Sequence, residues 1–121
     1  MATILVVDDE DHNRLLLSTI LGSVGHSVLE AGSGAEAMTI AQEHRPDLIV
    51  VDLSLPDMNG THLIKLLRGD PQLGDVRVAL YTASSVSAPM LDFMELMRIR
   101  CTIPKPSEPE DILNTVKDAL A

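Results

Sequence analysis

The apolar residues of this chain follow two patterns that alternate from the beginning of the sequence to its end. Short, nearly continuous apolar runs alternate with segments in which apolar residues recur every three or four positions. The runs cover about residues 3–8, 27–31, 48–52, 76–81 and, less clearly, 101–103. Continuous apolar runs are typical of strands buried on both faces, so the alternation predicts a parallel sheet with helices on both sides.

The helical segments carry start signals and an apolar face. In the first segment, the fourfold spacing of Leu16, Ile20 and Val24 predicts the buried side of a helix. The second segment is predicted to open with a capping box formed by Ser33 and Glu36.

The last three helices are predicted from the same kinds of signal. One begins near Gly60, and the next begins near Pro89, which a first helical turn tolerates. The final helix is predicted to open with a second capping box, Ser107 and Glu110. Its apolar side is expected to consist of Ile112, Val116 and Leu120.

Composition restricts the classes of protein that this chain can belong to. Its 121 residues are expected to form one domain, residues 1–121. Tyr81 and Phe93 are the only aromatic residues, so the core must be aliphatic and rich in methionine. A net charge of −9 disfavours direct binding to nucleic acid or to an anionic membrane. A single cysteine, the absence of a long apolar run and the absence of a signal sequence favour a cytoplasmic protein.

Polar residues with a common chemistry follow the predicted strands. Asp8 and Asp9 follow the first strand, Asp52 ends the third, Thr82 follows the fourth and Lys105 follows the fifth. Parallel strands end at the same edge of a sheet, where ligands bind in folds of this class, so these side chains are expected to lie together. Each has an ordinary alternative as a helix cap, a turn residue or a solvated lysine, but their common position favours a site.

Three neighbouring carboxylates repel one another, and a divalent cation would relieve that repulsion. Mg²⁺ prefers oxygen ligands and commonly binds one or two carboxylates together with a phosphate. A hydroxyl group and a lysine beside such a metal would stabilise a phosphoryl group from a second side. The pattern therefore predicts a Mg²⁺-dependent phosphoryl site.

With these residues, the chain resembles the receiver domain of two-component response regulators, and the chemotaxis regulators in particular. The matching segments are VVDDED, VDLSLPDMNG, YTAS and PKP, in family order and spacing, within residues 3–120. The resemblance implies a flavodoxin-like, doubly wound fold of five βα units with strand order 2-1-3-4-5. It also implies a phosphoacceptor domain that takes part in its own phosphorylation but is not a turnover enzyme.

The resemblance assigns roles to the acids of the site. Asp52 matches the family's phosphoacceptor, which attacks a partner's phosphohistidine. Asp9, Asp52 and the main-chain carbonyl of Ser54 match the direct Mg²⁺ ligands, and Asp8 matches an acid that acts mainly through water.

Further matches concern the switch that follows phosphorylation. Thr82 matches the hydroxyl that moves onto the phosphoryl group, Ala83 the small residue that leaves room for it, and Lys105 the cation that pairs with it. The bond between Lys105 and Pro106 matches a peptide bond that is usually cis in the family.

Two positions depart from the family pattern. Thr102 stands where the family usually has a tyrosine or phenylalanine that turns inward on phosphorylation, so output by a rotating ring is not expected here. Arg98 stands where the loop before the fifth strand commonly has glycine, which predicts an altered loop and a more basic surface.

Three other functions fit part of the sequence. Residues 32–37, GSGAEA, match a dinucleotide-binding motif, although they follow the second predicted strand instead of the first. An aspartate-nucleophile phosphatase would need an acid where Ser54 stands. A pure interaction module is the third alternative, because the fourth helix, with Leu91, Phe93 and Leu96, is apolar on more than one face.

The expected partners are a histidine kinase or a phosphotransfer protein. An output domain, or a second copy of the chain, would bind the face formed by the fourth helix, fifth strand and fifth helix. The sequence is compatible with a single-domain regulator and with a receiver taken from a larger sensor or hybrid kinase, and the segment PKPSEPEDIL resembles the endings of the latter.

Overall fold

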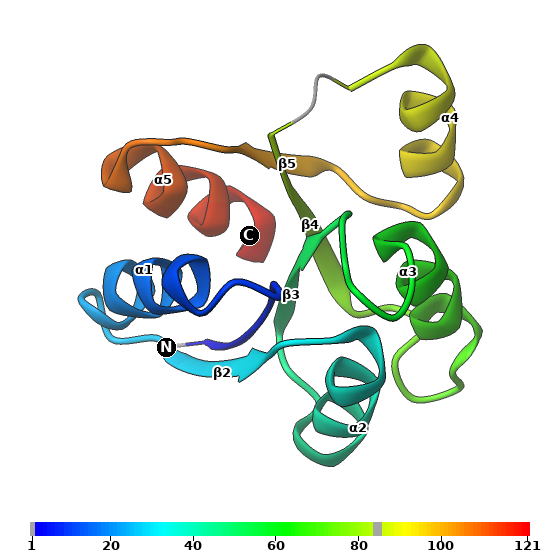
Figure 1. The fold of residues 1–121 in the computed structure, drawn as a ribbon, viewed down its shortest axis with the longest axis horizontal. Coiled ribbons are helices and arrows are strands. Elements are labelled where there is room, and N and C mark those ends of the chain that lie inside the picture. Colours follow the sequence, from blue (N-terminus) through cyan, green and yellow to red (C-terminus); the bar gives the residue numbers. More distant parts are fainter. Residues whose placement is uncertain (1, 84–85) are drawn as a thin grey trace.

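Five parallel strands form one sheet in the computed structural model, which describes residues 2–83 and 86–121. The order is β2-β1-β3-β4-β5, which confirms the predicted doubly wound, flavodoxin-like arrangement (Figure 1). The strands are β1 (Thr3–Val7), β2 (Ser27–Ala31), β3 (Leu48–Asp52), β4 (Arg77–Thr82) and β5 (Cys101–Pro104).

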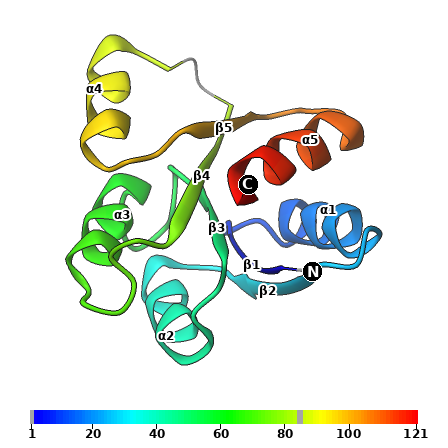
Figure 2. The same cartoon turned by 180° about the vertical axis from the view of Figure 1, so that it is seen from behind.

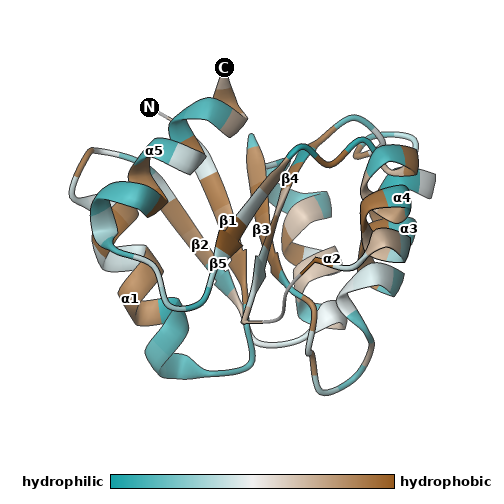
Figure 3. Ribbon diagram, turned by 90° about the horizontal axis from the view of Figure 1, so that it is seen from above, coloured by the Kyte–Doolittle hydropathy of each residue, from teal (hydrophilic) through white to brown (hydrophobic). Residues whose placement is uncertain are grey.

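Helices cover both faces of this sheet. They are α1 (Asp11–Gly22), α2 (Gly34–His44), α3 (Gly60–Gly69), α4 (Ala88–Leu96) and α5 (Pro109–Leu120). Helices α1 and α5 cover one face, whereas α2, α3 and α4 cover the other, as Figures 2 and 3 show. Among the described residues, no helix has the length and apolar character needed to cross a membrane.

The central strands separate two hydrophobic cores. In β1, Ile4 packs into the core under α1 and α5, and Leu5 packs into the core under α2, α3 and α4. Leu48 and Ile49 of β3 divide in the same way, and all four side chains are fully buried. Successive strand residues point to opposite faces, and here both faces are covered, so the sequence shows continuous apolar runs without alternation.

The predicted buried face of α1 is partly wrong. Ile20 is buried as expected, but Leu16 is 40% exposed and Val24, which follows the end of the helix, is 46% exposed. Leu17 and Leu21 complete the buried face instead. Leucines occupy three successive positions, 15–17, so spacing alone fits more than one rotation of the helix, and packing against the sheet selects one.

The two predicted capping boxes also differ in outcome. Ser33 Oγ accepts a hydrogen bond from the main-chain N–H of Glu36 at 3.2 Å, which confirms the first cap. The second prediction is wrong, because Ser107 Oγ donates to the carbonyl of Pro104 and the helix starts one residue later, after Glu108. Pro109 suits the first helical position, so it places the cap at the residue directly before it.

Candidate functional site

The ends of two neighbouring strands, β1 and β3, bring the predicted acids together. Val7 of β1 pairs with Val51 of β3, so the next residues, Asp8 and Asp52, lie side by side at the carboxyl edge of the sheet. Oxygen atoms of Asp8, Asp9 and Asp52 lie within 4.8 Å of one another. The three side chains form a cluster that could hold a metal ion.

Asp8 and Asp9 differ in their surroundings. Asp8 is completely buried, whereas Asp9 is exposed. One carboxylate oxygen of Asp8 accepts the main-chain N–H of Glu10 at 2.9 Å, and the other accepts the ammonium of Lys105 at 2.9 Å. Asp8 is therefore a fixed anchor within the structure, and Asp9 presents its carboxylate at the surface.

Asp52 lies at the centre of the site and is 7% exposed. Its Oδ1 accepts the main-chain N–H of Ser54 at 3.0 Å, and its Oδ2 accepts Lys105 Nζ at 3.0 Å. Burial raises the pKa of the Asp52 carboxyl above its usual value, although the hydrogen bonds from Ser54 and Lys105 oppose that rise. Each carboxylate oxygen of Asp52 is thus oriented by one hydrogen bond, and burial makes the anionic form of the side chain less favourable than it is in water.

Lys105 connects the two buried carboxylates. Burial alone would lower its pKa, but the hydrogen bonds to Asp8 and Asp52 outweigh that effect and raise the pKa of the ammonium. The ammonium also lies 4.5 Å from the centre of the Tyr81 ring. The main-chain N–H of Lys105 donates to the carbonyl of Thr82, and the peptide bond before Pro106 is cis, as the resemblance implied.

Thr82, Ala83, Ser54 and Thr102 surround this centre at different depths. Thr82 is the last residue of β4 and is 9% exposed, whereas Ala83 and Ser54 are exposed. Thr102 lies in β5, half-buried, and pairs with Leu80 of β4, two residues before Thr82. Thr82 therefore lies on a strand that pairs directly with β5, the strand that carries Thr102.

Arg14 is a structural contributor that the sequence did not predict. From the first turn of α1, its guanidinium donates to the carbonyl of Asp8 at 2.6 Å and lies 3.4 Å from a carboxylate oxygen of Glu30 in β2. It also pairs with Asp11. The only signal in the sequence was a single arginine three residues after the acidic segment. Its contacts tie the loop carrying Asp8 and Asp9 to the neighbouring strand.

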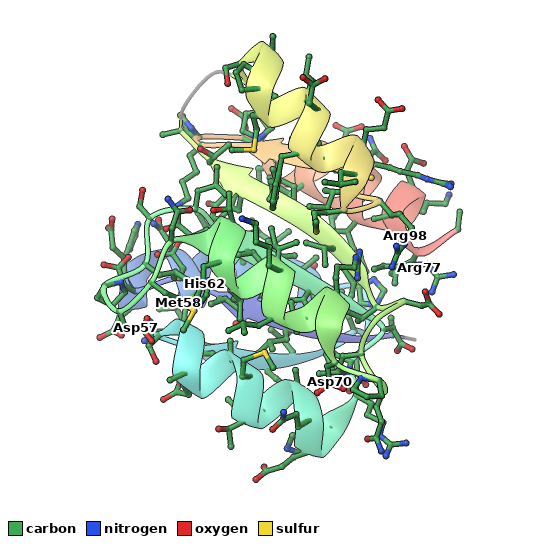
Figure 4. All side chains as sticks on the ribbon, turned by 90° about the vertical axis from the view of Figure 1, so that its right-hand side faces the viewer. Asp57, Met58, His62, Asp70, Arg77 and Arg98 are labelled. Atoms are coloured by element: carbon green, nitrogen blue, oxygen red, sulfur yellow. The ribbon has the colours of Figure 1, made fainter. Side chains whose placement is uncertain are left out.

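The loop after β3 is held against the start of α2 (Figure 4). The Asp57 carboxylate accepts the main-chain N–H groups of Gly34 at 2.8 Å and Ala35 at 3.0 Å. These two hydrogen bonds lower the pKa of Asp57 below its usual value. Met58 lies so close that a β-carbon at Gly34 would be 2.5 Å from its sulfur. The loop that follows Asp52 is thus anchored at its far end.

Gly60 closes the same loop next to Asp52. A β-carbon at Gly60 would lie 2.5 Å from the main-chain oxygen of Asp52, closer than real side chains come. Its N–H donates to the carbonyl of Leu53 at 2.9 Å. A side chain at this position would push the loop away from the strand end that carries Asp52.

The geometry also decides between the predicted alternatives. The N–H groups of Gly34 and Ala35, which a dinucleotide-binding motif would offer to a pyrophosphate, already donate to Asp57. Of the fourth helix, Met94 is buried, whereas Leu91 is 57% and Leu96 is 72% exposed. This helix is therefore not a fully buried core helix.

Comparison with known proteins places the chain in a family. The family model described as "response regulator receiver domain" matches residues 4–117. The chain belongs to the response regulator receiver domain family. The predicted class is thereby confirmed: this is a receiver domain of two-component signalling, a family that works with kinases or phosphotransfer partners and output domains.

Individual relatives agree with this assignment. The polar-differentiation response regulator DivK of Brucella anthropi is 33% identical over 81 residues, which are 67% of this chain and 66% of that protein. The Vibrio cholerae chemotaxis protein CheY4 has a TM-score of 0.92 with 30% identity, and the match covers 99% of both chains. A receiver domain of a Syntrophus aciditrophicus histidine kinase has a TM-score of 0.86 with 29% identity, covering 99% of this chain and 90% of that one.

Proposed function

We propose that this receiver domain accepts a phosphoryl group on Asp52 from a phosphohistidine of a kinase or phosphotransfer protein. The supporting observation is that Asp52 is the one acid of the cluster that contacts Lys105 and also faces the loop containing Ser54. A carboxylate oxygen of Asp52 attacks phosphorus, a P–O bond forms, and the P–N bond breaks with its electron pair remaining on the imidazole. The domain takes part in its own phosphorylation and is not a turnover enzyme.

The same proposal assigns Mg²⁺ to the acid cluster. Asp9, Asp52 and the carbonyl of Ser54 would hold the ion directly, and Asp8 would act through water. Carboxylates in this number and with this spacing suit a hard dication, and the ion would supply positive charge that offsets the charge of the transferring phosphoryl oxygens. Lys105 neutralises these oxygens from the opposite side. The hydroxyl of Thr82 donates a hydrogen bond to them, and the small side chain of Ala83 leaves room for the phosphoryl group.

Direct phosphorylation tests this proposal. Incubation with phosphoramidate and Mg²⁺ should add one phosphoryl group to the intact mass, and EDTA should prevent the addition. Asp52→Asn should abolish it, while Asp92→Asn, which removes an exposed acid on α4, should leave it unchanged. Labelling that persists in Asp52→Asn would place the acceptor elsewhere.

The exposed apolar residues of α4 suggest where a partner binds. Leu91 and Leu96 are exposed on two sides of this helix, and exposed apolar surface can mark an interaction site. We infer that an output domain or a second copy binds the face of α4, β5 and α5. If this surface works without phosphorylation, binding through it will persist in Asp52→Asn, and that result would favour the alternative of a pure interaction module.

A further inference from the structure

The edge of the sheet opposite to the acid cluster carries an unusual concentration of positive charge. A cavity of about 290 Å³ lies where β4 and β5 begin. Four of the chain's six arginines line it: Arg68, Arg77, Arg98 and Arg100. Figure 4 shows Arg77 and Arg98 together at this end, far from Asp57 and Met58. In a protein with a net charge of −9, four arginines at one cavity depart from the acidic character of the chain as a whole.

Two of these guanidinium groups are fixed by main-chain carbonyls. Arg68 donates to the carbonyls of Met97 at 2.7 Å and Val76 at 2.7 Å, and Arg98 donates to the carbonyl of Gly74 at 2.7 Å. Burial lowers the pKa of Arg68, and the charge of Arg98 adds to that effect. The two cations are therefore held close together at a repulsive cost.

The two other guanidinium groups have donors available. Within residues 2–83 and 86–121, neither Arg77 nor Arg100 makes a side-chain hydrogen bond or an ion pair. Arg77 begins β4, and Arg100 directly precedes β5. Two carboxylates, Asp75 and Asp118, also line the cavity, so the positive charge of the four arginines exceeds the negative charge of these side chains.

The backbone at Arg98 adds an independent observation. Arg98 has a φ of 62°, in the left-handed region that favours glycine, and its side chain points to the cavity edge. An arginine in this conformation destabilises the fold relative to glycine, so its presence calls for a compensating role. Its Nη2 donates to the carbonyl of Gly74 and lies 3.6 Å from a carboxylate oxygen of Asp75, which leaves the donors on its other two nitrogens for a ligand.

We propose that this arginine-lined cavity binds a small molecule through a phosphate group. Guanidinium groups recognise phosphate by paired hydrogen bonds, and a dianion matches the excess charge of the cavity. The volume suits a ligand of the size of pyrophosphate or a small phosphorylated metabolite. The site is separate from the proposed acceptor Asp52, at the other end of β4.

Binding can be tested with inorganic pyrophosphate as the probe. The experiment uses the Asp52→Asn protein in EDTA, so that the acid cluster takes no part, and follows backbone amide NMR shifts. We expect saturable shifts at residues 75–78 and 98–101. Arg77→Gln and Arg100→Gln should each weaken binding about tenfold, the usual effect of one hydrogen bond to a charged group. Lys65→Gln, which removes one exposed charge on α3, should not.

Two results would overturn the proposal. One is an equal response to acetate at matched ionic strength, because the cavity would then attract any anion without selecting phosphate. The other is a pyrophosphate response that Arg77→Gln and Arg100→Gln leave unchanged, or that is centred on residues 8–10 and 52–54. Since Asp52 is absent from the tested protein, either result leaves the phosphoacceptor proposal unaffected.

Discussion

Lys105 is the residue on which the arrangement of the buried acids depends. Among the described residues, it is the one cation within hydrogen-bonding distance of the side-chain carboxylates of Asp8 and Asp52, at 2.9 Å and 3.0 Å. Asp8 has no exposed surface, so water cannot replace the ammonium there without a rearrangement. Removing one partner of a buried ion pair costs more than the pair itself contributes, because the remaining charge is left uncompensated.

Lys105→Met should therefore lower the free energy of unfolding in metal-free buffer, by about 3 kcal/mol. Chemical denaturation at neutral pH measures this change. The double variant Lys105→Met/Asp8→Asn should recover part of the loss, because it removes the buried negative charge that the single variant leaves without a cation. A double variant that is no more stable than Lys105→Met would show that the lysine acts through packing on Tyr81 instead.

At the same scale, the sequence predicted the acids and missed their supports. Asp8, Asp9, Asp52 and Lys105 could be placed together because strand ends share an edge. Arg14 and Asp57 could not, because both act on main-chain groups outside their own segments: Arg14 on the carbonyl of Asp8, and Asp57 on the N–H of Gly34. Such contacts depend on the three-dimensional path of the loops, which leaves no periodic signal in the sequence.

At the scale of elements, α2 and the loop after β3 behave as one unit. Asp57 provides a carboxylate to the N-terminus of α2, where negative charge is favourable, and Met58 fills the space above Gly34. The prediction of strands succeeded because buried parallel strands have continuous apolar runs. The prediction for α1 failed at Leu16 and Val24 because a row of leucines does not define one helical face.

The Asp57 contact gives a pH-dependent contribution to stability. Its folded-state pKa lies below the usual 3.8, so the stabilisation is complete above that value and is lost as the pH falls through the folded-state pKa. The difference in unfolding free energy between wild type and Asp57→Asn should thus shrink below about pH 3.8. Urea titrations at several pH values measure it, and Asp92→Asn, at an exposed acid on α4, serves as a control for general acid effects. A difference independent of pH would contradict a charge-based contact.

Helix α4 and strand β5 should respond unequally to phosphorylation. If Thr82 moves onto the phosphoryl group, Thr102 is too small to fill the space that it leaves, so the change should pass to the start of α4. Amide exchange with and without beryllofluoride should differ around residues 83–95 and hardly at 101–103; residues 84–85 lie outside the described part of the chain. A response centred on Thr102, or none in α4, would contradict this.

At the scale of the whole molecule, the acid cluster links metal binding to folding. A ligand that binds only the folded state stabilises it by mass action, by about 1.4 kcal/mol at ten times its dissociation constant. The three carboxylates come within 4.8 Å of one another only when the chain is folded, because Asp52 is distant from Asp8 and Asp9 in the sequence. The predicted fold order brought them together, whereas the strength of the site depends on side-chain directions that the sequence does not specify.

Mg²⁺ should consequently raise the thermal midpoint of unfolding, and the rise should saturate. Asp9→Ala should abolish it, because this exposed acid is proposed to bind the ion directly, and Asp8→Ala should only weaken it. Differential scanning fluorimetry over a Mg²⁺ series measures both, with Asp92→Ala as the matched control. Wild-type behaviour in Asp9→Ala and Asp8→Ala would show that the ligands are assigned wrongly.

The strand order has a consequence for how such a molecule avoids polymerising. Strands β2 and β5 form the two open sides of the sheet, and each is short, with five and four residues. Glu30 places a charge in β2, and Pro104 ends β5 without an N–H to donate. Short, charged or proline-containing margins discourage the addition of a foreign strand. We therefore expect partner proteins to bind through the helical surfaces, and we do not expect them to extend the sheet by adding a strand to β2 or β5.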